Sequence, residues 1–443
     1  MSVKPPLEED GEVYVYLQPI PQEAQRLRFF IESVSAVKTD GSEYPLNLYV
    51  KEFKWEQEPR QRLVASGVLP PGSYSGLFFK TGKAFLQGEE GESAMATPEA
   101  PVKIESPFQI SKQKALLLNM NFKYAQSVKD EFSFSPVFSV FIPGKPVTGV
   151  LGFVSNPGQN NVTVFDKKGI QAVGVMATRS SPKGMALDQR ARRLYTALSG
   201  DDTIQVSDVI TQDVIQRVRL TVGDSPQELA LTPDGRTLLC VDSGSNTVSV
   251  IDTASYMETN RISVGNGPNS ILISPDGKRA YVFNMLSNSI TVIDIGNKAV
   301  VTTIGTESMP LRGQFNRKGD RLYVIHQFSP YMSVIDPASL SVLNKVYLGF
   351  GVTAIKVDTQ SDFIYIGRKD SDTIDIYDPF SLLPMDFMKS GQGTTYMTID
   401  GDENNLYVVG RDTISVLNLT SKKVLGRFDV GEDPYWVTLM GER

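Results

Sequence analysis

Residues 226–252 read PQELALTPDGRTLLCVDSGSNTVSVID, and residues 268–294 read PNSILISPDGKRAYVFNMLSNSITVID. Each stretch contains three short runs of mostly apolar residues, and an Asp-Gly pair separates the first run from the second. Short runs of this kind between turn residues are typical of β-strands, and Asp-Gly supplies the positive φ that a tight antiparallel turn requires. Each stretch therefore predicts three consecutive antiparallel strands.

The third strand of this pattern recurs along the C-terminal two-thirds of the chain and ends in a carboxylate or an amide. Seven segments share this form at intervals of 40 to 44 residues: 162–166, 204–208, 248–252, 290–294, 332–336, 374–378 and 414–418. A fourth strand follows each segment, and a glycine lies near the point where the chain leaves one repeat for the next. Self-similarity at this period predicts a β-propeller with one blade per repeat, so seven segments predict seven blades.

The two ends of the repeat region predict how the ring closes. The region begins at residues 151–156 with a strand of the second kind, which has no inner strand before it. It ends at residues 434–439 with an inner strand that has no blade after it. We expect these two segments to complete one blade, because ring closure removes sheet edges that invite aggregation.

The N-terminal third does not follow the period. Residues 12–142 contain strand-like runs separated by polar or Gly/Pro-rich turns, which predicts a β-sandwich of transthyretin- or immunoglobulin-like type. The runs are 13–17, 27–37, 76–79, 102–104, 115–122 and 137–142. We interpret the acidic stretch 87–100 as a loop, residues 143–146 as a short linker and residues 147–443 as the propeller.

The repeats resemble those of the YVTN family of β-propellers over about residues 146–443. The likeness is most specific in the two stretches quoted above, and it weakens where TQSDF and GDENN stand in place of PDGK. Residues 69–74 (LPPGSY) and 26–37 (RLRFFIESVSAV) make the N-terminal third similar to uncharacterised sandwich domains of bacterial lipoproteins. Both resemblances imply a periplasmic, extracellular or cell-surface protein.

Composition limits the classes of function. The chain has 443 residues, of which 41% are hydrophobic and 21% charged, as in ordinary folded proteins. Its net charge of −6 speaks against nucleic-acid binding, and no apolar run is long enough for a transmembrane segment. The polar start MSVKPPLEEDGEV has no signal-peptide core, so we expect a signal sequence removed upstream, and a lipid anchor there is left open.

The chain offers few residues for catalysis or metal binding. Its one cysteine, Cys240, lies in an apolar strand and is predicted to be a buried, inert thiol. Its one histidine, His326, occupies the strand-end position of Asn284 and is interpreted as a tolerated turn residue. Haem-attachment, zinc-cluster and nucleophile-elbow motifs are missing from the sequence, so we predict no cofactor, no metal and no catalytic residue.

The row of carboxylates and amides that ends the seven segments invites a calcium hypothesis. These side chains belong to different blades, however, and calcium needs six to eight oxygens that converge on one point. We therefore predict that each side chain caps the turn that follows its strand.

The inner strands carry the most promising candidate site. Alternate residues on these strands are polar and should lean toward the channel axis near one mouth. The candidate ligand-binding residues are Glu228, Arg312, Gln314, Lys356, Tyr396 and Trp436. Two cations beside two aromatic rings are suited to an anionic or carbohydrate-like group. The alternative is that Arg312 or Lys356 pairs with Glu228 across the channel.

These observations favour a non-catalytic binding or scaffold protein of the cell envelope or the extracellular space. Its partner would be a protein or a glycan or anionic ligand, held by a propeller face or the channel mouth. The aromatic residues of segment 327–331 (QFSPY) suit protein contacts. The alternative is a lactonase- or lyase-like enzyme that uses Glu228, Arg312 and Tyr396. A third possibility is a partner of redox proteins.

Overall fold

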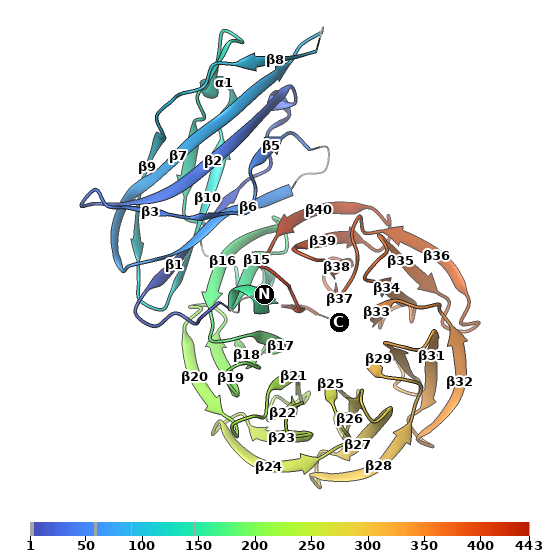
Figure 1. Ribbon diagram of the computed structural model, residues 1–443. Helices are drawn as coiled ribbons and strands as arrows, with labels where there is room; N and C mark the ends of the chain where they lie inside the picture. Colours follow the sequence, from blue (N-terminus) through green and yellow to red (C-terminus); the bar gives the residue numbers. More distant parts are fainter. Residues whose placement is uncertain (1–3, 57–59, 90, 145–146, 443) are drawn as a thin grey trace.

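The computed structural model describes residues 4–56, 60–89, 91–144 and 147–442. A ring of radiating sheets forms one unit, and a second unit of two sheets stands outside its rim beside β16 and β40 (Figure 1). Helical structure within the described residues is limited to α1 (Tyr124–Ser127) and the 3-10 turns η1 (Gln22–Ala24), η2 (Thr148–Val150) and η3 (Pro157–Gln159). The predicted all-β fold class with a propeller is confirmed.

Seven groups of four antiparallel strands surround the channel among the described residues, and we name them blades A to G with the inner strand first. Six of them are separate sheets, and the seventh continues through β40 into a sheet of the N-terminal unit. Blade A contains β41 (Trp436–Leu439), β14 (Leu151–Asn156), β15 (Asn161–Asp166) and β16 (Gln171–Ala177). Blade B contains β17 (Pro182–Asp188), β18 (Arg193–Leu198), β19 (Thr203–Asp208) and β20 (Val214–Arg219). Blade C contains β21 (Pro226–Leu231), β22 (Thr237–Asp242), β23 (Thr247–Asp252) and β24 (Met257–Ser263).

The other four blades repeat this order. Blade D contains β25 (Pro268–Ile273), β26 (Arg279–Asn284), β27 (Ser289–Asp294) and β28 (Ala299–Gly305). Blade E contains β29 (Pro310–Phe315), β30 (Leu322–His326), β31 (Tyr331–Asp336) and β32 (Ser341–Tyr347). Blade F contains β33 (Val352–Val357), β34 (Ile364–Arg368), β35 (Thr373–Tyr377) and β36 (Pro384–Lys389). Blade G contains β37 (Tyr396–Asp400), β38 (Asn405–Val409), β39 (Thr413–Asn418) and β40 (Val424–Asp429).

Blade A closes the ring as the sequence predicts. β41 pairs antiparallel with β14, from Gly152 opposite Leu439 to Ser155 opposite Trp436. A buried ion pair joins Lys167 Nζ to Asp400 Oδ2 at 2.9 Å, and Lys167 Nζ also donates to the carbonyl oxygen of Met440 at 2.6 Å. The C-terminal strand is thus held by blade A and by the neighbouring blade G.

The carboxylate and amide row caps turns, as predicted. In each of the seven blades, a backbone N–H two or three residues beyond the marker residue donates to its side chain. Such backbone hydrogen bonds lower the pKa of Asp336 and Asp378, and the Ser255 hydroxyl together with a backbone N–H lowers that of Asp252. The row therefore shapes the outer turns of the blades.

In four blades the second strand ends in a buried polar residue, namely Asn156, Asp242, Asn284 or His326, which corrects the interpretation of His326 as a turn residue. His326 is the last residue of β30, is only 2% exposed, and its Nδ1 lies 2.9 Å from the carbonyl oxygen of Tyr331. In blade D the equivalent Asn284 donates to Thr291 Oγ1 at 2.9 Å. In blade C the equivalent Asp242 accepts a hydrogen bond from Ser249 Oγ at 2.6 Å. The position ties the second strand to the third within each of these blades.

Asp242 makes the stability of the protein depend on pH. It is fully buried, and burial raises its pKa from the ordinary 3.8 to about 6. The folded state therefore holds this proton more tightly than the unfolded state does. The contribution to stability is complete below about pH 4 and is lost as the pH rises through about 6. Asp242→Asn is expected to raise the free energy of unfolding at pH 7.5 by about 2–3 kcal/mol, and by much less at pH 4, in urea denaturation.

The reverse change in blade D provides the control. Asn284→Asp places a carboxylate where Asn284 donates to Thr291, so it should lower stability at pH 7.5 and recover it toward pH 4. A difference between Asp242→Asn and wild type that does not vary with pH would contradict this account of Asp242.

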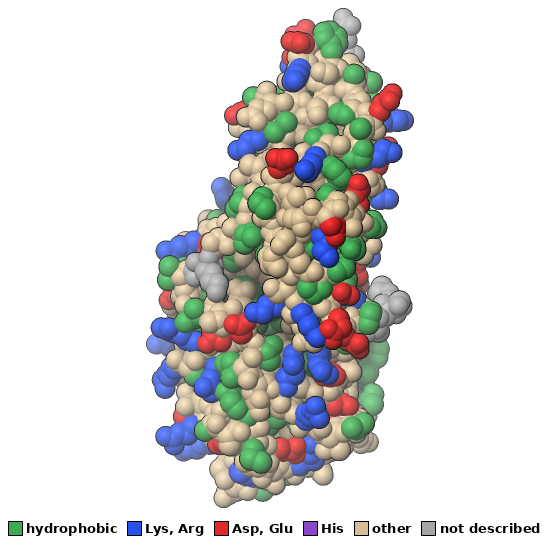
Figure 2. Space-filling model, turned by 90° about the vertical axis from the view of Figure 1, so that its left-hand side faces the viewer, with side chains coloured by type: hydrophobic (Ala, Val, Ile, Leu, Met, Phe, Trp, Pro, Cys, Tyr) green, Lys and Arg blue, Asp and Glu red, His purple; other side chains and the backbone are tan. Residues whose placement is uncertain are grey.

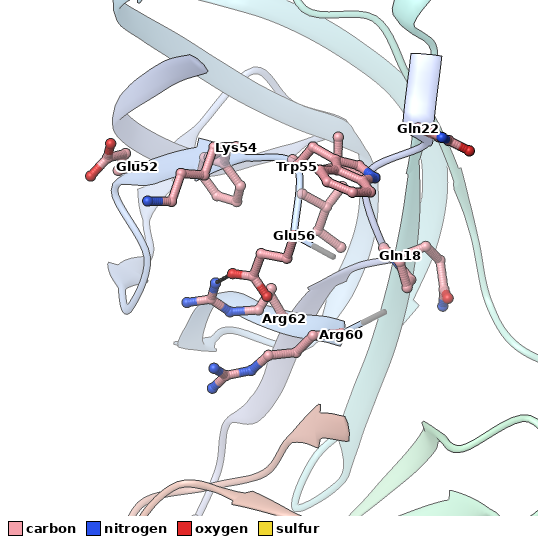
Figure 3. A pocket seen from close by; sticks show the side chains of 12 residues that line it. Gln18, Gln22, Glu52, Lys54, Trp55, Glu56, Arg60 and Arg62 are labelled. Carbon is pink, nitrogen blue, oxygen red and sulfur yellow. Dashed lines mark hydrogen bonds and ion pairs between the residues drawn. The ribbon is translucent and has the colours of Figure 1, made fainter. Parts of the chain in front are cut away.

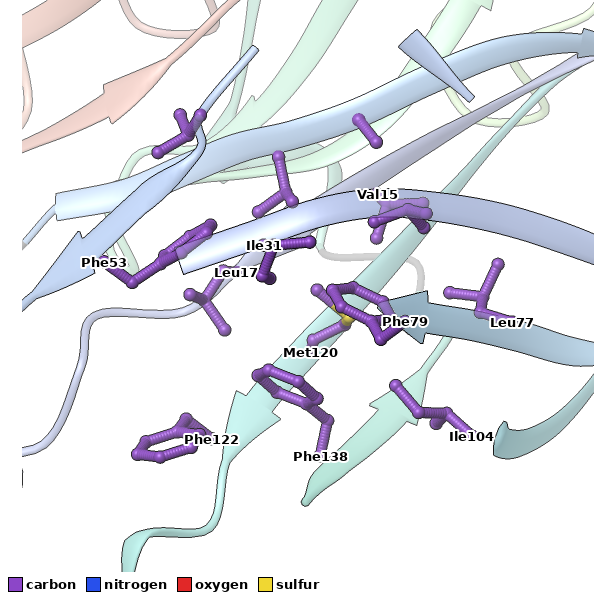
Figure 4. Packing of buried hydrophobic residues seen from close by; sticks show 14 of the residues in the cluster. Val15, Leu17, Ile31, Phe53, Leu77, Phe79, Ile104, Met120, Phe122 and Phe138 are labelled. Carbon is purple, nitrogen blue, oxygen red and sulfur yellow. The ribbon is translucent and has the colours of Figure 1, made fainter. Parts of the chain in front are cut away.

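The N-terminal unit consists of two sheets that face each other across one core. The first sheet contains β1 (Gly11–Leu17), β4 (Asn47–Leu48), β6 (Arg60–Leu69), β10 (Ala115–Phe122) and β13 (Phe138–Phe141). The second contains β2 (Leu27–Lys38), β3 (Glu43–Pro45), β5 (Glu52–Lys54), β7 (Gly72–Gln87), β8 (Glu92–Met95) and β9 (Val102–Ile110). A short hairpin joins β11 (Val128–Lys129) to β12 (Ser133–Phe134). Figure 4 shows Phe79, Met120 and Phe138 packed between the layers.

Several strands of this unit were not predicted, among them the short β3, β4, β5, β11 and β12, and two longer differences matter most. β6 was not predicted, and β8 lies inside the stretch 87–100 that we interpreted as a loop. β8 pairs with the end of β7, and the Glu92 carboxylate forms an ion pair with Arg28 at 2.5 Å. The likeness to transthyretin- or immunoglobulin-like domains stays a prediction. So does the boundary at the linker 143–146, since residues 145–146 lie outside the described residues.

β6 also joins the two units. Its first residues pair in parallel with β40, where Arg60 lies opposite Arg427 and Gln61 opposite Phe428. The buried Asp429 carboxylate of blade G accepts hydrogen bonds from Arg60 Nε at 2.7 Å and Arg62 Nε at 3.2 Å. Because a sheet and a shared apolar core cross this junction, the N-terminal unit is fixed to the rim of the propeller. Figure 2 shows this junction from the side, with positive and negative side chains intermixed over both units.

Candidate functional site

The inner strands surround a cavity of about 390 Å³, which we call the funnel. All six candidate ligand-binding residues line it. They come from blades C, E, F, G and A, so strands up to 208 residues apart in sequence meet at one place because the ring closes. Their role as ligand contacts stays a prediction.

A buried ion pair lines the funnel. Arg312 Nη2 lies 2.7 Å from Glu228 Oε1, and the Tyr435 hydroxyl donates to the same oxygen at 3.3 Å. Glu228 is fully buried, and burial raises its pKa. Burial alone would lower the pKa of Arg312, but Glu228 together with Tyr435 and Tyr396 outweighs burial and raises that pKa. The pairing that we weighed as the alternative to a ligand site is therefore present.

Two stacked aromatic rings cover Arg312. The Tyr396 and Trp436 ring centroids lie 4.2 Å apart with an angle of 24° between the planes. The Arg312 Cζ atom lies 4.8 Å from the Tyr396 centroid and 5.1 Å from the Trp436 centroid. Since a carboxylate and two ring faces already surround this cation, it is poorly placed to recruit an anionic ligand.

The second cation of the site is also beside a carboxylate. Lys356 Nζ lies 3.7 Å from Glu442 Oε1. Glu442 accepts hydrogen bonds from Thr438 Oγ1 at 2.7 Å and from Thr398 Oγ1. The sequence prediction missed Glu442, which follows the last strand and carries no repeat signal. It also missed Tyr435, although the Tyr-Trp pair at the start of the last inner strand could have indicated it.

The funnel has two unlike sides. Blades B, C and D supply most of the apolar lining, formed by Leu187, Ala230, Leu231, Leu272 and Ile273, together with the polar Gln189, Glu228 and Ser270. Blades E, F, G and A supply Gln314, the aromatic pair and the Lys356–Glu442 pair. The formal charges of Glu228, Glu442, Arg312 and Lys356 cancel. The lining is therefore amphipathic and neutral overall.

Outside the funnel, the described residues offer few side chains suited to metal binding or catalysis. Over the described ranges, three or more His, Cys, Asp or Glu side chains do not gather anywhere in an arrangement that could hold a metal ion. Cys240 is buried, and burial raises its pKa well above the ordinary value, which agrees with the predicted inert thiol. Nor do those ranges contain a helix of the length and apolar character needed to cross a membrane.

Comparisons with known proteins agree on the fold. The family model described as "YNCE-like beta-propeller" matches residues 156–357. Hydrazine synthase of Kuenenia stuttgartiensis is similar at 22% identity and a TM-score of 0.54, over 65% of this chain and 94% of that one. The dihydro-heme d1 dehydrogenase NirN, in complex with DHE, is similar at 17% identity and a TM-score of 0.53, over 68% and 77%.

A functionally unknown protein of Desulfotomaculum acetoxidans DSM 771 is similar at 14% identity and a TM-score of 0.56, over 64% of this chain and 98% of that one. A search of curated proteins finds no match. At these identities the solved structures show a shared fold alone. The likeness of the N-terminal unit to lipoprotein domains stays a prediction. Residues 156–357 thus match a YNCE-like β-propeller model, which agrees with the YVTN-like repeats expected from the sequence.

Proposed function

We propose that the protein is a non-catalytic binding protein of the periplasm or the cell surface, and that its funnel holds a small, uncharged amphipathic group. The observation that carries this proposal is a cavity of about 390 Å³ in which each charged side chain already lies beside an opposite charge. That size suits a small ligand or the tip of a protein or glycan partner.

The two sides of the funnel define the chemistry of this group. An apolar portion fits against Leu231 and Ile273, and burying it is favourable by about 25 cal/mol per Å². A hydroxyl or amide portion fits beside the half-buried Gln314. A ligand with a full charge would have to compete with the Arg312–Glu228 pair for its partner. We therefore favour the uncharged class over the anionic class that the two cations first suggested.

The lactonase- or lyase-like alternative would rest on Glu228, Arg312 and Tyr396. These residues lie together, and a buried carboxyl with a raised pKa is a feature of many active sites. Burial, however, raises the pKa of Tyr396 well above its ordinary value, which disfavours Tyr396 as a phenolate base. A panel of lactones assayed with and without a divalent metal separates the two functions, and turnover that depends on Glu228 would overturn our proposal.

The two tryptophans of the chain allow a direct binding test. Trp55 lies in the N-terminal unit and Trp436 in the funnel, so Trp55→Phe leaves Trp436 as the sole indole reporter. We expect phenyl β-glucoside, which is neutral and amphipathic, to change the fluorescence of this variant in a saturable way. Phenyl β-glucuronide should bind at least about fivefold more weakly, because its carboxylate finds no unpaired cation in the funnel.

A substitution in the wall of the funnel locates the binding site. Gln314→Leu removes the uncharged amide of the polar side and should weaken phenyl glucoside binding by about 3- to 10-fold. Gln216→Leu, at an exposed position on β20, is the matched control and should bind as the parent does. Stronger binding of the glucuronide than of the glucoside would show that the funnel selects anions and would refute the proposed ligand class.

A further inference from the structure

A second cavity lies in the N-terminal unit, away from the propeller axis. It has a volume of about 290 Å³ and lies where the end of β1, the turn η1, β5 and the start of β6 meet (Figure 3). Figure 3 shows Trp55 between Lys54 on one side and Gln18 and Gln22 on the other, with Arg60 and Arg62 below it. Leu17, Ile20 and Phe53 complete an apolar wall. We call this cavity the Trp55 pocket.

The carboxylates at the Trp55 pocket are already paired with arginines. Glu56 Oε1 lies 2.9 Å from Arg62 Nη1. Glu52 Oε1 lies 3.4 Å from Arg28 Nη1, outside the pocket. The pocket therefore presents no carboxylate without a cation beside it among the described residues. A cationic ligand would find no partner of its own there.

The hydrogen-bond donors of the pocket are only partly used. Arg60 donates a hydrogen bond from Nε to Asp429. Its two terminal nitrogens have no hydrogen-bond partner within the described part of the chain. Lys54 is exposed, and its ammonium likewise has no ion-pair partner in that part. Gln18 Nε2 is shielded from solvent, and none of the described residues accepts a hydrogen bond from it. An amide left in this state is unfavourable unless an acceptor reaches it.

From these donors and the indole we infer that the Trp55 pocket binds a carboxylate-bearing sugar. A sugar ring presents an apolar C–H face that can pack on the partly exposed Trp55 ring. Its carboxylate would accept charge-assisted hydrogen bonds from the terminal nitrogens of Arg60 and from Lys54. Its hydroxyl oxygens are the acceptors that the Gln18 amide lacks. A carboxylate on a purely aliphatic ligand would leave the indole and the amide unused.

The experiment uses the full chain with Trp436→Phe, in which Trp55 is the only indole. We expect trigalacturonate to change its fluorescence in a saturable way, and the fully methyl-esterified trisaccharide to bind at least about tenfold more weakly. Lys54→Gln and Arg60→Gln, each in this background, should weaken trigalacturonate binding by about fivefold or more. Binding of the acid should also weaken with rising salt.

The controls keep the result specific to the pocket. Lys123→Gln removes an exposed lysine elsewhere on the same unit and should leave binding unchanged. Arg60→Gln also removes a contact to Asp429, so the Lys54→Gln result, which involves no such contact, decides the test. Equal binding of acid and ester, an unchanged affinity in Lys54→Gln, or no response to trigalacturonate, glucuronate or sialyllactose would overturn the inference. None of these outcomes bears on the funnel, because Trp436 is absent.

Discussion

Deletion of residues 434–443 is expected to open the propeller and to lower its stability by about 5 kcal/mol or more. The deletion removes β41, whose Val437 and Leu439 are fully buried, and each such side chain contributes about 1.5–3 kcal/mol. It leaves one edge of β14 without a partner and takes the Met440 carbonyl from Lys167. The melting temperature should fall by about 10 °C, and the truncated chain should associate through its open edges.

The missing strand can be returned as a separate molecule. A synthetic peptide of residues 434–443 should restore part of the lost melting temperature, because it can pair with β14 as β41 does. A peptide of the same composition in scrambled order should have no effect. If the truncated chain melted at the temperature of the full chain and stayed monomeric, β41 would not be the element that closes the ring.

Arg312→Met is expected to destabilise the protein by about 3–5 kcal/mol at pH 7.5, since removing one partner of a buried ion pair leaves the other charge without compensation. The uncompensated charge is the Glu228 carboxylate, which is fully buried in the wall of the funnel. Burial already raises the pKa of Glu228, and loss of the cation raises it further. The variant should therefore regain stability as the pH falls and the carboxyl takes up a proton.

The two partners of this pair should not be equivalent. Glu228→Gln should lower the free energy of unfolding by less than Arg312→Met does. Burial disfavours the charged form of the Glu228 carboxyl. The rings of Tyr396 and Trp436, in contrast, stabilise the Arg312 cation. The double variant Glu228→Gln/Arg312→Met should recover most of the stability lost in Arg312→Met. Urea denaturation of the four proteins gives the coupling energy, and additive effects would show that the pair does not act as a unit.

Much of the propeller was predictable because its rules are local. The Asp-Gly turns place Gly235 and Gly277 at φ of +73° and +72° in hairpins of adjacent strands. The row of turn caps depends on residues two or three positions apart. The alternation of the inner strands placed six side chains toward one mouth, and all six line the funnel. Turn residues, strand alternation and turn caps that recur about every 40 residues predict each blade without any knowledge of how neighbouring blades pack.

The features that sequence reasoning missed depend on contacts between distant segments. β6 was not predicted; it pairs along most of its length with β1, and its first two residues pair with β40, more than 360 residues further along the chain. Glu442 belongs to no strand, yet its carboxylate contacts Thr398, Thr438 and Lys356 from three blades. His326 was expected in a turn, but it is the last residue of β30 and its side chain is buried inside the blade.

The sequence by itself determined the repeat, the closing strand and the ring of polar residues at the channel mouth, because period and alternation specify strands and the faces they present. Only the tertiary structure decided whether the charged side chains at that mouth are paired with one another. Whether Arg312 is open to an anion or held by Glu228 depends on a 2.7 Å contact between blades C and E, and no spacing in the sequence encodes that contact. The same holds for the Trp55 pocket, whose unused donors appear only once Asp429 of the propeller has taken one nitrogen of Arg60.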